Sequence, residues 1–311
     1  MREKLRLWAA LLGSGLAGML VALQSRINGG LSQQLGNGFV TAAVSFGSGL
    51  VILSVLMLLS RKGRQGLRRL RAEVASHHLP WWALCGGAGG AMFVLNQGLV
   101  APLTGLALFT VGIVAGQVVG GLLLDKAGLG PGGRINPTVP RIIGTGIAIL
   151  AVVIAVGGGA GSTVWLVVFP VVVGAGVAAQ SMVNGLVRSA AQSALAATFV
   201  NFVVGTALLL LFAVVSMLVT GLPTQWPSEP WHYLGGLIGT IFIAIAAMLV
   251  RTAGVLLLSM ANVAGQLVAA VVFEVAVPLA GGVSTAMFIG SGIALLAVVV
   301  AALPARARRP G

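Results

Sequence analysis

The sequence predicts an all-α integral membrane protein of ten transmembrane helices, arranged as two inverted five-helix repeats. Three observations support this fold class. The composition is strongly apolar, ten apolar runs are flanked by Lys and Arg residues that fall on one side of the membrane, and a set of residue landmarks occurs twice in the same order.

The composition places most of the chain in a lipid bilayer. Hydrophobic residues make up 58% of the 311 positions, and charged residues only 7%. A water-soluble domain of this size needs a charged surface, so lipid must cover most of the outside. A net charge of +13 would suggest nucleic-acid binding in a soluble protein. Here the basic residues lie between apolar runs, where membrane topology explains them, so we expect the bilayer and not nucleic acid as a partner.

Ten apolar runs are long enough to cross the hydrocarbon core, which takes about 20 residues. The first five lie near 7–30, 38–59, 80–100, 103–125 and 141–160, and the second five near 163–186, 195–219, 231–250, 253–275 and 284–303. The first run could be mistaken for a signal peptide, but it is long, lacks a convincing cleavage site and recurs in mid-chain. We expect it to remain as the first transmembrane helix.

The Lys and Arg residues indicate the orientation of these helices. With the amino terminus inside, all 18 except Arg26 fall in inner segments. This is the asymmetry of the positive-inside rule, and it places both termini in the cytoplasm. The basic segment from Gly63 to His78 forms either a short amphipathic helix on the inner leaflet or a mobile loop that fixes topology.

Landmarks recur in both halves of the chain. Gln24 and Asn28 match Gln180 and Asn184. Further matches pair Phe46-x2-Gly49 with Phe202-x2-Gly205, Pro80-Trp81 with Pro230-Trp231, Gly116-Gln117 with Gly265-Gln266, Asp125 with Glu274, and Gly144-x-Gly146 with Gly290-x-Gly292. The shared order indicates a duplication, with repeats over 1–160 and 161–311. Because five helices are an odd number, the second repeat enters the membrane from the opposite face, as in secondary transporters.

At these residues the sequence resembles the YdcZ-like branch of the drug/metabolite transporter (EamA-like) superfamily, in a tandem-fused ten-helix form. The features that carry the resemblance are Gln-x3-Asn in the first helix, Phe-x2-Gly in the second, Gly-Gln with a downstream acid in the fourth and Gly-x-Gly in the fifth. The resemblance implies a multi-pass protein of the bacterial inner (cytoplasmic) membrane that exports small molecules. The chain departs from strict repetition in having Glu274 opposite Asp125, and in lacking a second copy of the Asn96-Gln97 pair.

Six amide side chains in the apolar runs are the candidate substrate-binding residues. They are Gln24, Asn28, Gln117, Gln180, Asn184 and Gln266. Polar groups are costly within a membrane, so each must face a partner, a cavity or a neighbouring helix. These amides either line a central cavity between the halves or join helices by hydrogen bonds. Three lone amides are expected to bond between helices, and these are Asn96, Asn201 and Asn262.

Asp125 and Glu274 are the acids nearest the membrane core, and they are the candidates for proton coupling. Asp125 adjoins Lys126 at the inner boundary, where a solvated ion pair is the simpler interpretation. Glu274 is flanked by apolar residues and is the stronger candidate of the two, although it lies near the outer boundary, just before Pro278.

No sequence pattern indicates an enzyme, a metal site or a cofactor. We expect a secondary transporter of a small metabolite or drug, a monomer or homodimer driven by protons or by the gradient of its own cargo. A second class stays open, namely a non-transporting membrane scaffold subunit or a lipid scramblase. A cavity that reaches mid-membrane between the halves would favour transport, whereas a solid core with a lipid-facing groove would favour the alternative.

Overall fold

The computed structural model describes residues 2–129, 134, 136–157, 164–253, 255–280 and 284–303. The helices are α1 (Arg2–Leu35), α2 (Gly38–Leu59), α3 (Arg61–Ala75), α4 (Gly87–Leu99), α5 (Ala101–Thr104), α6 (Leu106–Ala127), α7 (Val139–Gly157), α8 (Val168–Ala191), α9 (Ala194–Thr220), α10 (Gly235–Ala253), α11 (Val255–Ala276) and α12 (Thr285–Ala302). Short 3-10 turns at Trp81–Gly86, Val164–Val167 and Pro230–Tyr233 precede α4, α8 and α10. The part of the chain that the structure describes contains no strand.

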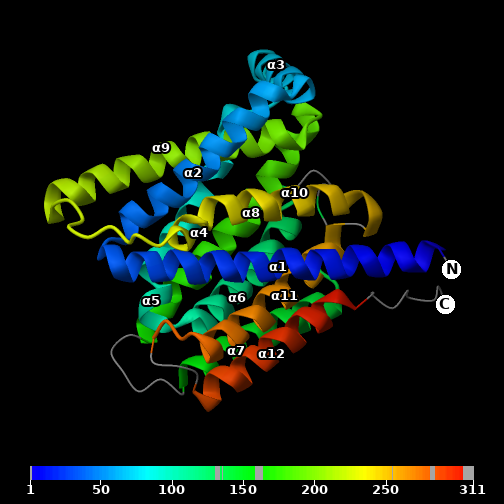
Figure 1. The fold of residues 1–311 in the computed structure, drawn as a ribbon. Coiled ribbons are helices and arrows are strands. Elements are labelled where there is room, and N and C mark those ends of the chain that lie inside the picture. The colour runs from blue at the N-terminus through cyan, green and yellow to red at the C-terminus, as the bar shows by residue number, and fades with distance from the viewer. Residues whose placement is uncertain are drawn as a thin grey trace, which may run out of the picture.

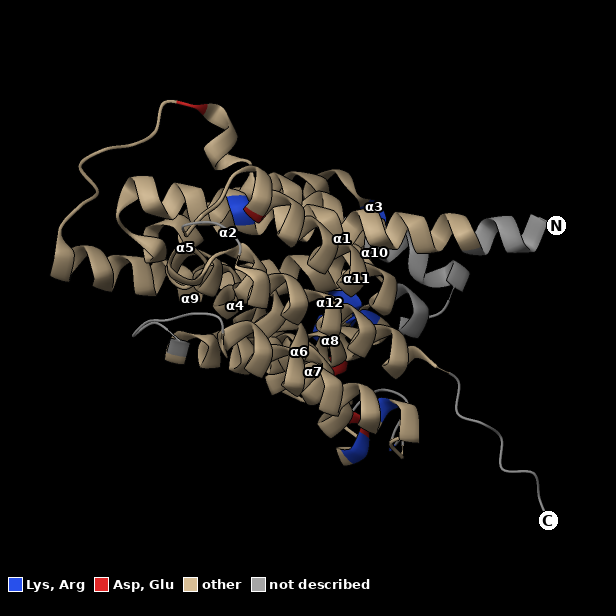
Figure 2. Ribbon diagram, turned by 90° about the horizontal axis from the view of Figure 1, so that it is seen from below, with Lys and Arg blue, Asp and Glu red and all other residues tan. Residues whose placement is uncertain are grey.

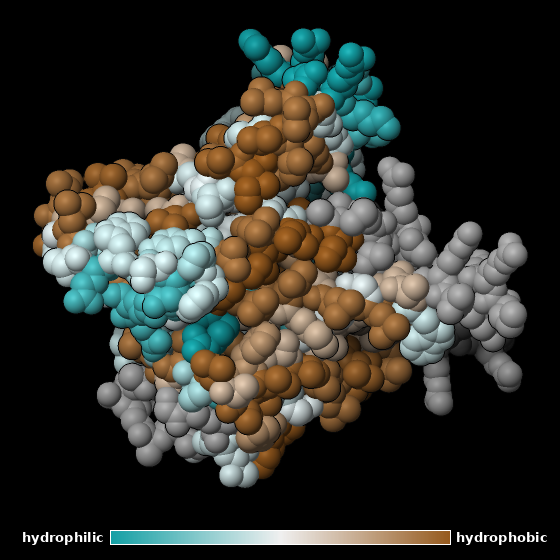
Figure 3. All heavy atoms as spheres, viewed as in Figure 1, coloured by the Kyte–Doolittle hydropathy of each residue, from teal (hydrophilic) through white to brown (hydrophobic). Residues whose placement is uncertain are grey.

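Eight of these helices are long and apolar enough to cross a membrane, judged among the described residues. They are α1, α2, α6, α7, α8, α9, α11 and α12. Much of the surface is correspondingly hydrophobic (Figure 3), and charged residues occupy few positions on the ribbon (Figure 2). The all-helical membrane fold is therefore confirmed. The predicted ends at 160 and 163, and the boundary between the predicted repeats, lie outside the described residues.

The third predicted span, 80–100, is interrupted in the structure. It consists of a 3-10 turn and the 13-residue helix α4, and the four-residue helix α5 follows it. Thirteen residues of α-helix extend about 20 Å, which is short of the hydrocarbon thickness of about 30 Å. Pro102 cannot donate a backbone hydrogen bond, and Gly105 has a φ of +81°, so the chain turns there before α6 begins.

The basic segment after α2 is helical and becomes α3, which projects from one end of the bundle (Figure 1). Gly63, Gly66 and Leu70 form its buried face. A Cβ built at Gly66 would lie only 2.5 Å from the Cβ of Ser193, so α3 packs directly on the start of α9. The apolar face of α3 thus contacts protein, while its basic residues are exposed.

The long helices pack as four pairs, each with one helix from either half of the chain. The pairs are α1 with α11, α6 with α8, α2 with α9, and α7 with α12. Glycines bring the backbones together. A Cβ built at Gly18 would lie 1.8 Å from the carbonyl O of Asn262, and one built at Gly174 would lie 2.1 Å from that of Ile113. Gly18 in α1 and Gly174 in α8 therefore make equivalent contacts, each with the pairing helix of the other half.

The same reciprocity holds between α7 and α12, which lie side by side in Figure 1. A Cβ at Gly144 would lie 2.8 Å from the carbonyl O of Ala297, and one at Gly290 would lie 2.9 Å from that of Ala151. The first glycine of each Gly-x-Gly motif thus sets the helix contact. The second glycines, Gly146 and Gly292, face open space. The start of α1 and the end of α12 lie at the same end of the bundle (Figure 1).

Candidate functional site

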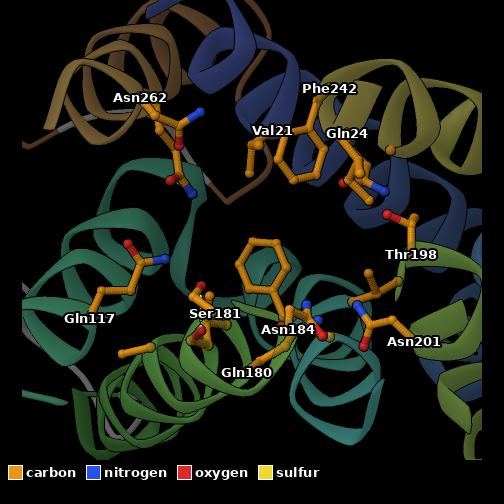
Figure 4. A pocket seen from close by; sticks show the side chains of 18 of the residues that line it. Val21, Gln24, Gln117, Gln180, Ser181, Asn184, Thr198, Asn201, Phe242 and Asn262 are labelled. Carbon is orange, nitrogen blue, oxygen red and sulfur yellow. Dashed lines mark hydrogen bonds between the residues drawn. The ribbon is translucent and has the colours of Figure 1, made fainter. Parts of the chain in front are cut away.

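A cavity of about 430 Å³ lies between the two halves of the chain. Eight helices line it, namely α1, α2, α4 and α6 from the first half and α8, α9, α10 and α11 from the second. Its volume falls in the range of small-molecule sites. The amide side chains in its wall are Gln24, Gln117, Gln180, Asn184, Asn201, Asn262 and Gln266. Figure 4 shows the labelled amides around the open space.

Of the six predicted amides, the structure brings together all but Asn28 at this cavity. Gln24 and Gln180 lie against glycines of the opposite half. A Cβ at Gly239 would lie 2.7 Å from Nε2 of Gln24, and one at Gly90 would lie 2.6 Å from Nε2 of Gln180. Each glutamine side chain therefore lies over a glycine of a neighbouring helix. Gln24 Nε2 is further held, because it donates to the carbonyl O of Gly235 at 2.9 Å.

Two stacked aromatic rings form part of the cavity wall. The rings of Phe46 in α2 and Phe202 in α9 have centroids 4.6 Å apart and an interplanar angle of 18°. A Cβ at Gly205 would lie 2.4 Å from the Phe46 ring, and one at Gly49 would lie 2.5 Å from the Phe202 ring. Each Phe-x2-Gly motif thus contributes a ring and receives the ring of the other motif. This explains why phenylalanine and glycine occur together at this spacing in both halves.

One side of the cavity is sealed by hydrogen bonds. Asn28 is fully buried and donates from Nδ2 to Oε1 of Gln97 at 2.7 Å, and Gln97 Nε2 donates to Ser25 Oγ at 2.8 Å. Ser32 Oγ donates to the carbonyl O of Gly98 at 2.6 Å one turn further along α1. These bonds fasten the later part of α1 to α4. Asn28 therefore closes the site and does not line it.

The other side of the cavity is less tightly closed. Asn184 and Ser181 occupy the positions in α8 that match Asn28 and Ser25. Asn184 is partly exposed, Ser181 is exposed, and both line the cavity. A second cavity of about 400 Å³ shares Gln117 and three further wall residues with the first. It lies between α6, α7, α11 and α12. The open space therefore continues past Gln117 toward the end of α6.

An ion pair lies in the wall of this second cavity. Asp125 accepts a hydrogen bond from Arg141 in α7, with Nη1 and Oδ2 2.6 Å apart. The expectation that Asp125 would pair with its neighbour Lys126 is therefore corrected. The reason is geometric, because side chains on adjacent helical positions diverge, whereas α7 presents Arg141 to Asp125.

Glu274 is buried at the opposite end and lines neither cavity. Its carboxylate accepts hydrogen bonds from the backbone N–H of Leu106, the first residue of α6, and from those of Leu279 at 3.2 Å and Ala280 at 3.4 Å. A negative charge at a helix N-terminus is favourable because it offsets the helix dipole. Glu274 thus connects α11, and the turn that follows it, to the start of α6.

Sequence reasoning missed several residues that line or support the cavity. Asn201 and Asn262, expected only to join helices, both line the cavity. Asn262 lies four residues before Gln266, the same spacing as Gln24 and Asn28, and this spacing could have revealed it. Gln97 was noted only for its missing counterpart, although it holds Asn28. Among the residues that the structure describes, no cluster of His, Cys, Asp and Glu could hold a metal ion.

Comparison with known families places these features in context. The family model described as "Putative inner membrane exporter, YdcZ" matches residues 9–154 and, separately, residues 165–303. The two matches lie one in each half and together cover most of the chain. A search of curated proteins found no significant match.

Proposed function

The chain belongs to the YdcZ inner-membrane exporter family, and from this premise we propose that it is a secondary active transporter. Two inverted five-helix repeats, 1–160 and 161–311, would move a small metabolite or drug by alternating access. The resemblance recognised from the sequence is confirmed by the family match, and a multi-pass position in the inner membrane follows from it. The observation that carries the proposal is the reciprocal set of contacts across a central cavity.

Reciprocal contacts support exchange between two states. Gln24 lies over Gly239 as Gln180 lies over Gly90, and the rings of Phe46 and Phe202 each lie over a glycine of the other motif. Halves that make equivalent contacts can trade conformations, so that the side now sealed opens while the other seals. The later part of α1 and the matching part of α8 would then alternate, so that one is packed while the other faces open space.

The present asymmetry indicates which state the structure represents. The side near Asn28 is sealed, whereas the space near Asn184 continues toward Asp125 and Arg141. With all Lys and Arg residues except Arg26 on the inner side, the end of α6 is cytoplasmic, as are both termini. On this orientation the cavity faces the cytoplasm, from which an exporter collects its cargo.

In this mechanism the five cavity amides that the sequence predicted bind the cargo, and Asn28 belongs to the outer gate. Gln24, Gln117, Gln180, Asn184 and Gln266 present hydrogen-bonding groups to the cavity. Carboxamides can both donate and accept, so they can exchange water for a polar cargo without a change of protonation.

Proton exchange would act through a carboxylate that the cavity reaches. Asp125 lines the continuation of the cavity, next to the guanidinium of Arg141. Glu274 is engaged by three backbone N–H groups away from both cavities. We expect Asp125→Asn to uncouple flux from an imposed pH gradient and Glu274→Gln to lower stability with coupling retained. The reverse pattern in proteoliposomes would assign the proton to Glu274.

The cavity favours transport over the scaffold or scramblase alternative, because it lies between the halves and is lined by eight helices. The test uses a cargo found by a ligand-stabilisation screen of the purified protein. Gln24→Ala and Gln180→Ala, singly and together, should each reduce its flux in proteoliposomes, while Gly47→Ala on the outward face of α2 serves as a control. Unchanged flux in the double variant would contradict the proposed site. Translocation of a fluorescent lipid with no cargo flux would support a scramblase instead.

A further inference from the structure

The cavity wall carries hydrogen-bonding groups and aromatic rings but no net charge. Among the described residues that line the cavity of about 430 Å³, none has an ionisable side chain. The charged groups that border its continuation, Asp125 and Arg141, neutralise each other at 2.6 Å. A charged solute that entered would lose hydration and meet no fixed countercharge, which is costly in a membrane interior.

Two polar atoms in the wall make no hydrogen bond to any residue that the structure describes. Gln266 is 2% exposed and Asn201 is 6% exposed, yet Nε2 of Gln266 and Oδ1 of Asn201 make no hydrogen bond within the described structure. A buried polar group without a partner destabilises the protein, so binding of a solute that supplies the missing hydrogen bond is favoured at each atom. Nε2 of Gln266 needs an acceptor, and Oδ1 of Asn201 needs a donor.

These two residues belong to different parts of the wall. Gln266 follows Asn262 by about one turn on α11, and Figure 4 shows Asn262 across the open space from Asn201 on α9. A single solute that spans the cavity could therefore meet both unpartnered atoms.

Aromatic rings define the shape of the space between them. Phe93, Phe242 and the stacked pair of Phe46 and Phe202 belong to the cavity wall. Aromatic side chains bind planar apolar groups through offset or edge contacts. The wall therefore combines apolar faces with a donor at one place and an acceptor at another.

From these observations we propose that the cavity binds an uncharged planar solute with a hydrogen-bond acceptor near one end and a donor near the other. The inference rests on the proposed function, because it treats this cavity as the cargo site. It goes further in excluding cations and anions as preferred cargo and in assigning Gln266 and Asn201 as residues that set specificity.

Three probes of similar ring structure separate the possible charge classes. Nicotinamide is neutral, nicotinate is an anion, and 1-methylnicotinamide is a cation. Equilibrium binding of each is measured with the full chain in nanodiscs of zwitterionic lipid. We expect nicotinamide to bind at least about tenfold more tightly than either charged probe. Each charged probe must lose the hydration of its charge on entering the cavity, whereas nicotinamide carries no charge. Equal or tighter binding of a charged probe would overturn the proposal, as would binding of none of the three.

Substitutions test the two assigned residues. Gln266→Leu and Asn201→Leu should each weaken nicotinamide binding by about tenfold, the usual effect of removing a buried hydrogen bond. Asn96→Leu removes another buried amide that lies outside the cavity wall, and should leave the affinity unchanged. Gln266→Glu keeps the size of the side chain and should reverse the preference toward 1-methylnicotinamide. Retention of wild-type affinity and charge preference in a correctly folded Gln266→Glu protein contradicts the proposal.

Flux measurements distinguish this inference from the transport proposal. Binding selective for nicotinamide without any movement across proteoliposomes would retain the cargo class and reject transport. Movement that favours a charged probe would retain transport and reject the cargo class.

Discussion

Gln97 holds two polar side chains of α1 at the sealed side of the cavity. Its Oε1 accepts from Asn28, whose own Oδ1 bonds to none of the described residues, and its Nε2 donates to Ser25. Gln97→Leu should lower the free energy of unfolding by about 1–3 kcal/mol, because Asn28 loses its bond while remaining buried. Unfolding of the purified variant in detergent measures this loss.

Asn96→Leu is the matched control for that substitution. Asn96 is buried in the same turn of α4, and its Oδ1 has no hydrogen-bond partner in the described structure. Its replacement should cost clearly less than replacement of Gln97. If the two variants lose equal stability, the amide bonds to α1 do not fasten this side of the cavity.

The Phe-x2-Gly motifs give a second prediction at this scale. Gly205→Ala would place a Cβ 2.4 Å from the Phe46 ring, so the ring or α9 must move, at a cost of about 1–3 kcal/mol. Gly47→Ala points into open space and should be neutral or stabilising by up to about 1 kcal/mol. Thermal unfolding of both variants checks the contrast.

A double-mutant cycle isolates the ring as the cause. Phe46→Leu combined with Gly205→Ala should cost less than the sum of the two single changes, because the shorter side chain makes room for the new Cβ. Additive losses would show that the glycine serves a different contact.

Which side chains would face the cavity was only partly predictable from the sequence. Pairing of repeats identified Gln24 and Gln180, because a duplicated polar residue in an apolar run stands out. It could not separate Asn28 from Asn184, which match in sequence but differ in burial, since that difference arises from Gln97 on another helix. Asn201 has serine at the matching position of the first half, so no repeated amide marked it.

At the scale of helices, the close packing of α7 on α12 predicts which glycine substitutions destabilise the protein. Gly144→Ala and Gly290→Ala would each place a Cβ within 3 Å of the partner helix, forcing α7 and α12 apart. Each should cost about 1–3 kcal/mol. Gly146→Ala and Gly292→Ala lie on the opposite face of each helix, where a Cβ would have no described atom within 4 Å, and should be tolerated. Unfolding of the four proteins under identical detergent conditions measures the pattern, and equal effects at all four sites would contradict it.

The apolar runs predicted the long helices well and the interrupted one poorly. Runs of about 20 apolar residues become single helices in α2, α6 and α9, because the bilayer requires internally satisfied backbones. The run at 80–100 is also apolar but divides between a 3-10 turn and the short helix α4. Glycines within it lower helix propensity, and Pro102 lies just after it, so the apolar run does not become one long helix.

At the scale of the whole molecule, the account depends on an asymmetry between two similar halves. The later part of α1 is fastened to α4 by an amide network, whereas the equivalent positions of α8 face open space. The second half has Ala246 where repetition would place a partner to Gln97, so its gate cannot use the same bonds. The state closed near Asn28 should therefore be more stable than the state closed near Asn184, and it should predominate in the absence of cargo.

A reversible crosslink across the sealed side tests alternating access most directly. Gln33 Nε2 donates to the carbonyl O of Leu279 at 2.7 Å, which joins the end of α1 to the turn after α11 on this sealed side, so positions 33 and 280 lie near each other. Gln33→Cys and Ala280→Cys can be joined by a short reducible bis-thiosulfonate after the chain's single cysteine is removed by Cys85→Ser. The account predicts that the crosslinked protein still binds its cargo from the cytoplasmic side, that flux falls to the level of empty liposomes, and that reduction restores it. Full flux through the crosslinked protein would contradict the account.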